Sequence, residues 1–263
     1  MNKNRMPVVF SGHGSPMLAL EHSSETETLR KVGDTMIEQF GKPEAILSIS
    51  AHWYTDGTFV QSAPEPEQIY DMYGFPDELY DFKYPAKGSA ELTAAVKELL
   101  GNKVSINDEW GIDHGTWTVL CHMFPEADIP VVQLSVSKKA TPAQCVEIGK
   151  ALAPLRDRGF LIFASGNVVH NLGRVEWDNP GGSPMTETFN ADITDAIVSG
   201  RIEEVINYSK HAYAYYAVPT PEHFLPLLYI LGAAGDDRPT VFNNVCNLGA
   251  IAMTGYAFGL QEK

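Results

Sequence analysis

The residues best suited to chemistry in this 263-residue chain are five histidines that lie far apart in the sequence. Imidazole is the commonest metal-ligating side chain, and it also titrates near neutral pH. A group of histidines can therefore hold a metal ion, move a proton, or do both at one site. The five candidates are His13, His52, His114, His170 and His223.

Three of these histidines follow apolar runs that predict buried strands. The runs are residues 7–11, 45–50 and 159–164, and the histidines are His13, His52 and His170. Ligands of open α/β sheets collect outside the carboxyl ends of the strands, where side chains from distant segments can meet. One histidine after a strand is more often a hydrogen-bonded structural residue. The repetition of the pattern favours a common site.

The other two candidates stand beside glycine or near a helix start. His114 lies in Gly111-Ile112-Asp113-His114-Gly115, and His223 follows Thr220-Pro221-Glu222. Glycine lets a backbone pass close to a ligand, although it can also mark only a turn. We therefore expect both histidines to face the same site as the first three.

The remaining histidines are interpreted as structural or exposed residues. They lie in a polar stretch, on a predicted helix and in a tyrosine-rich segment, and are His22, His122 and His211. The tyrosines of residues 213–216 are candidates for a pocket lining, but aromatic residues at such spacing more often only pack.

Three familiar catalytic motifs are absent from the sequence. Gly12-His13-Gly14-Ser15-Pro16 lacks the GK[ST] ending of a phosphate-binding loop. Ser15, Ser50 and Ser165 have no G-x-S-x-G elbow around them, which disfavours a serine hydrolase. No GxGxxG follows the first strand, so a nucleotide cofactor is not expected.

Alternating strands and helices must position the histidines. The predicted strands are residues 7–11, 45–50, 129–136, 159–164 and 250–258, and the predicted helices are 25–40, 89–100, 141–156, 184–199, 202–209 and one that begins at 220. This alternation predicts one α/β domain over residues 1–263, with a central mostly parallel or mixed sheet flanked by helices on both faces. Residues 62–84 have no clear period and predict a long surface excursion, a common place for lids and binding loops.

Composition excludes several classes of partner. The net charge of −14 argues against nucleic acid, whose phosphates require a basic face, and against anionic membranes. No apolar stretch approaches the length of a membrane span, and Met1 to Pro7 does not form a signal peptide. Cys121, Cys145 and Cys246 stand alone, which indicates a reducing compartment. We expect a cytoplasmic protein.

In its histidine segments the chain resembles the class III extradiol ring-cleaving dioxygenases, and most closely their DOPA 4,5-dioxygenase subgroup. Each segment alone is weakly specific, but together they keep the order of the family and span nearly the whole chain. The matching segments are Gly12-His13-Gly14-Ser15-Pro16, Ser50-Ala51-His52-Trp53, Gly111-Ile112-Asp113-His114-Gly115, residues 164–171 and residues 220–226.

The resemblance implies a role for each histidine. His13 and His52 match two metal ligands, and His223 matches the third ligand of the subgroup. The wider superfamily uses a glutamate as third ligand, so Glu222 remains the alternative. His170 matches the acid/base residue, and in zinc-loaded members of the subgroup it is a fourth ligand. His114 matches a histidine beside the oxygen and substrate sites.

The implied reaction is the opening of a small catechol such as DOPA by O₂ to a muconate semialdehyde. It requires a redox-active metal with open coordination positions, as in non-heme Fe(II) oxygenases. His170 would take a proton from the catechol and later return one, while His114 would stabilise charge on dioxygen. Zn²⁺ binds more tightly than Fe²⁺ in the usual affinity order, so purified protein is expected to carry zinc, which has no redox chemistry.

Two other functions fit the same residues. A zinc hydrolase would bind the metal through His13, His52 and His223 and activate a water molecule. A non-catalytic metal-binding or interaction protein could keep the fold and lose the chemistry, because fold does not fix function. Such a protein would have no need of His114 and His170. The candidate substrate-binding residues lie in the excursion of residues 62–84 and in residues 213–216.

Overall fold

Four strands rich in β-branched and aromatic residues form the middle of the protein. The structure is a computed structural model and describes residues 5–260. These parallel strands lie in the order β5-β2-β6-β1 and are almost completely buried, as expected for a sheet covered on both faces. They are β1 (Val8–Gly12), β2 (Ala45–Thr55), β5 (Val131–Ser137) and β6 (Phe160–Gly166). Residues 1–4 and 261–263 lie outside this description. The prediction that residues 1–7 form no signal peptide therefore falls partly outside the described residues.

Short strands extend the sheet at both edges to the order β4-β3-β5-β2-β6-β1-β10-β7 within the described residues. β10 pairs antiparallel with both β1 and β7, and β3 pairs antiparallel with β5. The sheet is therefore mixed with a parallel centre, which confirms the predicted fold class. The edge strands are β3 (Phe59–Val60), β4 (Ser105–Ile106), β7 (Pro239–Phe242) and β10 (Gly255–Phe258).

The prediction of a single last strand over residues 250–258 is wrong. This apolar run contains β9 (Ile251–Ala252) and β10, and Met253 and Thr254 separate the two strands. β9 pairs with β8 (Cys246–Asn247) in a small second sheet. The break allows the first half of the run to pack beside residues 169–171, while the second half joins the main sheet.

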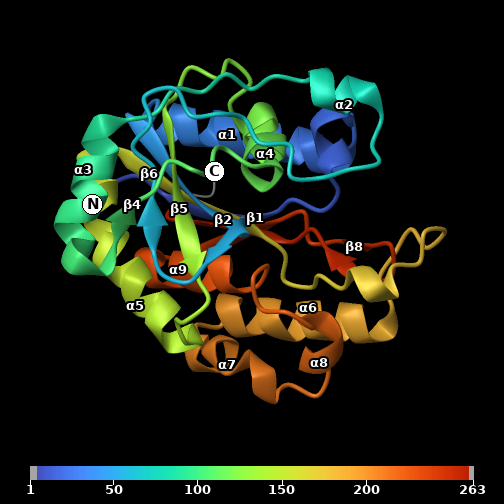
Figure 1. Cartoon of the computed structure of the whole chain (residues 1–263). Coiled ribbons are helices and arrows are strands. Elements are labelled where there is room, and N and C mark those ends of the chain that lie inside the picture. The colour runs from blue at the N-terminus through green and yellow to red at the C-terminus, as the bar shows by residue number, and fades with distance from the viewer. Residues whose placement is uncertain (1–4, 261–263) are drawn as a thin grey trace.

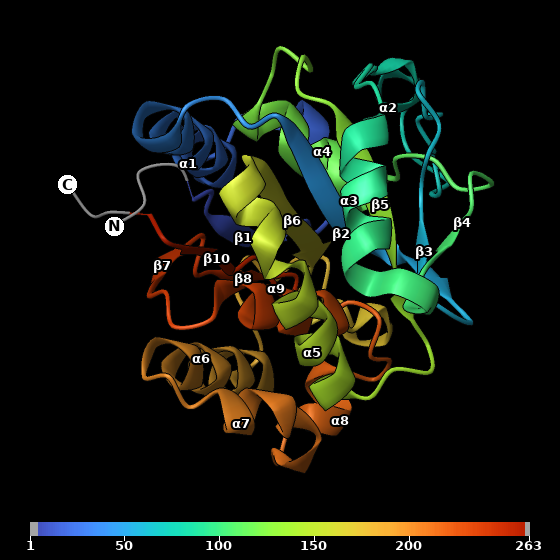
Figure 2. The ribbon, with the colours of Figure 1, turned by 90° about the vertical axis from the view of Figure 1, so that its left-hand side faces the viewer.

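Helices cover both faces of the sheet (Figures 1 and 2). Alternate residues of β1 show the two cores, because Val8 and Phe10 belong to one hydrophobic cluster and Val9 to the other. The Val9 face is covered by α1 (Ser24–Phe40) and α4 (His114–Met123). The opposite face is covered by α3 (Ala90–Leu100), α5 (Pro142–Leu152), α6 (Pro184–Val198), α7 (Ile202–Ile206), α8 (Ala214–Ala217) and α9 (Leu225–Ala234).

Local signals explain how several helices begin and end. Thr141 caps α5 by accepting from the backbone of Gln144, whose side chain accepts from Thr141 in return. The chain leaves the α-helical form at Leu152 and continues as a 3-10 helix over Ala153–Arg158, so the predicted end near residue 156 falls in that helix. The helix predicted to begin at 220 begins at Leu225 instead.

Strand β2 is longer than predicted, and its extension carries a candidate site residue. The sequence predicts an end at Ser50, whereas the strand continues to Thr55. Its register with β5 shifts between Ser50 and Tyr54. His52 therefore lies in an irregular part of a strand and not beyond its end. Such irregularities bend a strand and redirect its side chains.

The predicted excursion of residues 62–84 packs over α4 (Figure 1) and contains the short helix α2 (Asp77–Asp81). The backbone of Ile69 is tied to this region, since its N–H donates to the Ile112 carbonyl and its carbonyl accepts from Trp117 Nε1 at 3.0 Å. Leu79 is completely buried. The excursion is thus fixed to the body of the protein near the start of α4.

Within residues 5–260, every helix is too short or too polar to cross a lipid bilayer.

Candidate metal centre

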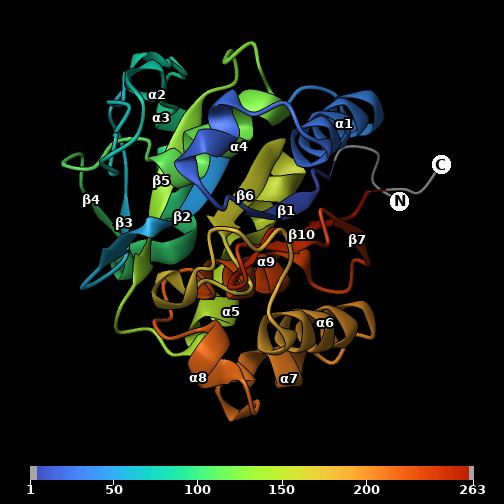
Figure 3. The same cartoon turned by 90° about the vertical axis from the view of Figure 1, so that its right-hand side faces the viewer.

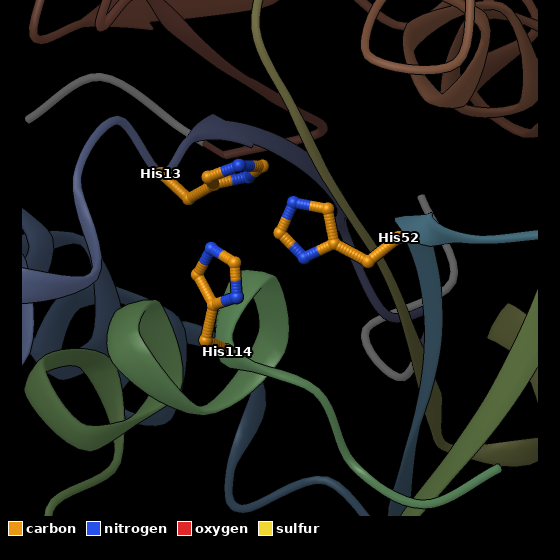
Figure 4. A group of neighbouring side chains, drawn as sticks. All are labelled: His13, His52 and His114. Carbon is orange, nitrogen blue, oxygen red and sulfur yellow. The ribbon is translucent and has the colours of Figure 1, made fainter. Parts of the chain in front are cut away.

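The five predicted histidines meet beside the carboxyl ends of β1, β2 and β6. His13 directly follows β1, His52 lies in the extension of β2, and His114 is the first residue of α4. Figure 4 shows these three rings directed toward one another from three separate segments. The loop between β6 and α6, which carries His170, crosses this side of the molecule (Figure 3). His223 lies just before α9.

Ring distances show that the three proposed ligands form one group. The ring centroids of His13 and His52 are 4.8 Å apart. His223 lies 5.2 Å from His52 and 5.3 Å from His13 by the same measure. Of the three, His13 and His223 are buried and His52 is slightly exposed. The structure therefore brings together the residues that the sequence analysis proposes as ligands.

The two remaining histidines contact this group from opposite sides. The centroids of His114 and His52 are 4.0 Å apart, and His170 stacks on His223 at 3.5 Å with an interplanar angle of 9°. Potential ligand atoms of His13, His52 and His114 lie within 4.8 Å of one another, and so do those of His170, Glu222 and His223. All five predicted histidines belong to one site.

The hydrogen bonds of Ser165 determine the tautomer of His13. The Ser165 hydroxyl donates its one proton to the carbonyl oxygen of Gly115, which can only accept. The same hydroxyl oxygen lies 2.8 Å from Nδ1 of His13 and must therefore accept from it. His13 thus carries its proton on Nδ1, and its Nε2 presents a lone pair.

Carboxylates act in the same way on the other rings. Asp71 Oδ1 lies 2.8 Å from Nδ1 of His114, and its Oδ2 lies 3.1 Å from Nδ1 of His52. Glu222 Oε1 lies 3.2 Å from Nδ1 of His223. An ionised carboxylate only accepts hydrogen bonds, so Nδ1 of His114 and Nδ1 of His223 donate. Nδ1 of His52 lies at ion-pair distance from Asp71 but outside hydrogen-bond geometry. The Nε2 atoms are left free to bind a ligand.

A metal ion fits this arrangement. Nε2 of His52 and Nε2 of His223 face each other at 3.3 Å. Two nitrogens bound to a tetrahedral zinc ion at about 2.0–2.1 Å lie about 3.3 Å apart. Metal-binding histidines typically direct their other ring nitrogen at a carboxylate or another acceptor. His13 and His223 donate to such a partner, and Nδ1 of His52 lies 3.1 Å from Asp71.

Burial and mutual proximity keep most of the imidazoles neutral. Burial lowers the pKa of His13 and His114, and in both cases the charge of His52 lowers it further. Burial lowers the pKa of His223 to about 4, although Glu222 opposes this shift. Burial and the neighbouring His223 lower the pKa of His170 to about 2. These four rings are therefore neutral at pH 7, each with a single ring proton.

His52 differs from its neighbours. Burial disfavours its charged form, but the nearby carboxylates of Asp113 and Asp71 outweigh this effect and raise its pKa to about 9. Hydrogen bonds from His114 and His52 lower the pKa of Asp71 despite its burial. Without a metal ion, His52 thus holds a proton that its Nε2 can donate toward His223 at 3.3 Å.

Two glycines leave space for this packing. A Cβ atom on Gly115 would lie 3.2 Å from the His52 ring and from Ser165 Oγ. A Cβ atom on Gly166 would lie 2.2 Å from the carbonyl oxygen of His223. That carbonyl accepts from the backbone N–H of Asn167 at 2.9 Å, so the segment that carries His223 is tied to the end of β6.

An orienting role for Asp71, Glu222 or Ser165 was not predicted from the sequence, where Ser165 was a candidate only as a nucleophile. Asp71 had no local signal, because it lies in a segment without periodicity. Asp113 lies in the family-like segment Gly111-Ile112-Asp113-His114-Gly115, but no function was predicted for it. It is completely buried and accepts from Ser50 at 2.7 Å and from Trp110 Nε1 at 3.0 Å, and its Oδ1 lies 3.7 Å from His52 Nδ1.

The other histidines lie outside the group of five. His122 Nε2 donates to the carbonyl oxygen of Leu18 at 2.7 Å. His211 Nε2 lies 2.9 Å from Asp192 Oδ2, and His22 is exposed. Within residues 213–216, Tyr215 is 74% exposed, so its ring does not line a buried pocket.

Comparison with known proteins gives a consistent result. Residues 7–259 match the family model described as the catalytic LigB subunit of aromatic ring-opening dioxygenase. A protein of Escherichia coli K12 named 4,5-DOPA dioxygenase extradiol is 42% identical, over 98% of this chain and 97% of the relative. A protein of the same name from Beta vulgaris is 38% identical, over 95% of each chain.

A solved structure shares the fold. The crystal structure of an uncharacterized protein from Escherichia coli K12 superposes with a TM-score of 0.83 at 39% sequence identity. The match covers 97% of this chain and 100% of the other.

Proposed function

This chain belongs to the family of the catalytic LigB subunit of aromatic ring-opening dioxygenases, and on that premise we propose that it cleaves the ring of a small catechol with O₂. Members of this extradiol dioxygenase family are metal-dependent oxidoreductases. The proposed substrate is a DOPA-like catechol opened at the 4,5 position to a muconate semialdehyde. This proposal is supported by relatives named 4,5-DOPA dioxygenase extradiol at 42% and 38% identity.

One observation carries the proposal. Nε2 of His52 and Nε2 of His223 face each other, the His13 ring packs against both rings, and a polar partner lies beside each Nδ1 atom. This is the hydrogen-bonding pattern of metal ligands, and three protein ligands leave coordination positions open for small molecules. A merely structural cluster of histidines would have no reason to direct unpaired nitrogens toward one another.

We propose His13, His52 and His223 as the metal ligands. Glu222 is placed behind His223, where its Oε1 accepts from His223 Nδ1 and from Thr220 Oγ1 at 2.7 Å. A carboxylate occupied in this way orients the histidine, so His223 and not Glu222 is the proposed third ligand. His170, which stacks on His223, is the proposed fourth ligand in a zinc-loaded form.

His170 is the proposed acid/base residue. Its backbone is held by the Ala217 carbonyl, but its ring makes no hydrogen bond with any residue in the described part of the chain. The ring is neutral at physiological pH and partly exposed. We propose that its free ring nitrogen takes a proton from a catechol hydroxyl and returns it later in the reaction.

His114 is proposed to act on the oxygen side of the reaction. Because Nδ1 donates to Asp71, the neutral ring presents a lone pair at Nε2 and first acts as an acceptor. It can stabilise negative charge on dioxygen after it takes up a proton, and the Asp71 carboxylate would then stabilise the imidazolium. This order of events refines the role that the family resemblance implies.

A bound Fe²⁺ ion would supply the electron transfer between catechol and O₂, and Zn²⁺ would not. We propose Fe²⁺ as the active metal and zinc as the ion most readily acquired on purification. The residues of this chain orient the ligands and keep four of the five rings neutral.

The direct test is anaerobic reconstitution with Fe²⁺, followed by exposure to O₂ and a panel of catechols that includes DOPA. We expect oxygen uptake together with the yellow absorbance of a ring-opened semialdehyde. The zinc-loaded protein is the matched metal control and should consume no oxygen. His211→Ala is the protein control, because His211 lies outside the site and this variant should keep full activity.

Two outcomes would contradict the proposal. Hydrolytic activity of the zinc-loaded protein without oxygen consumption would favour a metallohydrolase. Binding of Fe²⁺ without turnover of any catechol in the panel would favour a protein that has kept the site and lost the reaction.

A further inference from the structure

Asp71 is the one residue in the described part of the chain whose carboxylate contacts Nδ1 of both His52 and His114. Its Oδ1 accepts from Nδ1 of His114 at 2.8 Å and from the backbone N–H of His114 at 3.1 Å. Its Oδ2 lies 3.1 Å from Nδ1 of His52. Each oxygen thus serves a different ring.

We infer that Asp71 is a positioning residue that holds His52 and His114 in the Nδ1–H tautomer at the same time. A carboxylate has two equivalent accepting oxygens and no proton to donate. Any ring nitrogen that faces it must therefore carry the hydrogen, and the lone pair of a neutral ring moves to Nε2. For His52 this tautomer leaves Nε2 able to bind a metal ion, and for His114 it leaves Nε2 as an acceptor.

The second nearby carboxylate cannot replace Asp71. Asp113 is fully buried, and its two oxygens already accept from Ser50, Trp110 and Gln133. Its approach to His52 Nδ1 is longer, at 3.7 Å. Asp113 also caps α4 through the backbone N–H of Thr116. It is therefore committed to the architecture of this corner, whereas among the described residues the Asp71 carboxylate hydrogen-bonds His114 and lies at ion-pair distance from His52 Nδ1.

The excursion of residues 62–84 positions Asp71 beside His52 and His114. Two residues earlier, Ile69 is bonded to the Ile112 carbonyl and to the Trp117 indole. One residue earlier, the Tyr70 hydroxyl donates to the carbonyl oxygen of Phe82 at 2.6 Å. These bonds fix the two residues that precede Asp71, so its carboxylate is preorganised. Preorganised outer partners commonly strengthen metal binding by about 10–100-fold.

This inference rests on the proposed function in one respect, namely that His52 binds the metal. The test compares zinc affinity of the full-length wild type and Asp71→Asn by competition with a chromophoric chelator. An asparagine amide has one accepting oxygen and one NH₂ group, so one ring loses its acceptor and meets a donor instead. We expect zinc affinity to fall about 10–100-fold.

A second measurement reports the tautomers directly. Two-bond ¹H–¹⁵N NMR spectra of histidine-labelled, zinc-loaded protein distinguish a protonated Nδ1 from a protonated Nε2. In the wild type we expect protonated Nδ1 in both His52 and His114. In Asp71→Asn at least one of the two rings should change tautomer, a result that a purely structural role would not produce.

Asp108→Asn is the matched control. Asp108 also anchors the excursion through its carboxylate, which accepts from Ser62 N, Ser62 Oγ and Ala63 N. It makes no recorded contact with the histidines, so its variant should keep zinc affinity within about twofold and leave both tautomers unchanged. If Asp71→Asn does not fold by circular dichroism, Asp71→Glu replaces it. That variant retains the carboxylate and should retain both tautomers.

Equal zinc affinity and unchanged tautomers in a folded Asp71→Asn variant would overturn the inference, as would a changed tautomer in Asp71→Glu. Failure of the wild type itself to bind zinc would instead overturn the proposed function. The two failures are therefore distinguishable in the same titration.

Discussion

Nε2 of His52 lies 3.3 Å from Nε2 of His223, although 171 residues separate them in the chain. Their other ring nitrogens are held by Asp71 and Glu222, respectively. The two facing nitrogens must therefore share either a proton or a metal ion, since two lone pairs at this distance repel. A proton and a metal ion therefore compete for these two nitrogens.

Metal binding should release a proton from His52. Its pKa is raised to about 9, above the ordinary value of 6.5, so the metal-free ring is protonated at pH 7 and loses its proton only as the pH approaches 9. A metal ion must displace that proton. We expect zinc affinity to rise about tenfold per pH unit from pH 7 and to level off near pH 9.

Calorimetry of zinc binding at pH 7.5 in buffers with different ionisation enthalpies measures this release directly. About one proton should appear per ion bound, because the pKa values of His13, His114, His170 and His223 are all lowered and these rings are already neutral. An affinity that stays flat between pH 7 and pH 9 would show that His52 is not a ligand.

Replacement of Glu222 and His223 should separate the two candidates for the third ligand. If His223 binds the metal, His223→Ala should lower zinc affinity more than Glu222→Gln, which removes the charge of an orienting partner and keeps one accepting oxygen. Zinc titration of both variants is the measurement. The reverse order of effects would identify Glu222 as the ligand.

Ser165→Ala should weaken metal binding through His13. The variant removes the acceptor for His13 Nδ1 and leaves the Gly115 carbonyl without its hydroxyl donor. An unsatisfied buried group costs about 1–3 kcal/mol, and loss of the orienting bond should lower zinc affinity about tenfold. Urea unfolding and zinc titration measure the two effects.

Ser11→Ala is the control for that variant. Ser11 pairs with Ser165 in the register of β1 and β6 and is equally buried, but its hydroxyl bonds only the Gly12 carbonyl. The variant should leave zinc affinity unchanged. A similar loss of affinity in both variants would indicate general damage to the sheet and not a role for Ser165.

Arg156→Met should destabilise the fold. The guanidinium is 1% exposed and ties the start of β1 to the end of α9. Its partners are the carbonyl oxygens of Met6, Ala233 and Ala234 and the carboxylate of Asp237. The variant leaves these buried carbonyl oxygens without their donor, and an unsatisfied buried group costs about 1–3 kcal/mol, which urea unfolding would detect as a lower midpoint.

The neighbouring Arg158→Met variant provides the comparison. The side chain of Arg158 is 38% exposed and pairs with Glu98 at 3.0 Å on the surface, where such pairs contribute about 1 kcal/mol or less. Similar losses in the two variants would contradict the structural role assigned to Arg156.

The sequence by itself determined the α/β fold class and the five histidines of the site. Buried strands read as continuous apolar runs because helices cover both faces, so β1, β2, β5 and β6 were visible without a structure. The histidines stood out because each follows or adjoins an element boundary. The rule that ligands gather at the carboxyl ends of strands then predicted their convergence.

Only the tertiary structure decided which polar groups orient those histidines. Asp71 reaches His52 and His114 from a segment without periodicity, and Ser165 meets His13 across 152 residues of sequence. The shift of register in β2 likewise depends on pairing with β5 and has no local signature. Periodicity reports burial along one element, whereas a hydrogen bond between distant segments depends on how the elements pack together.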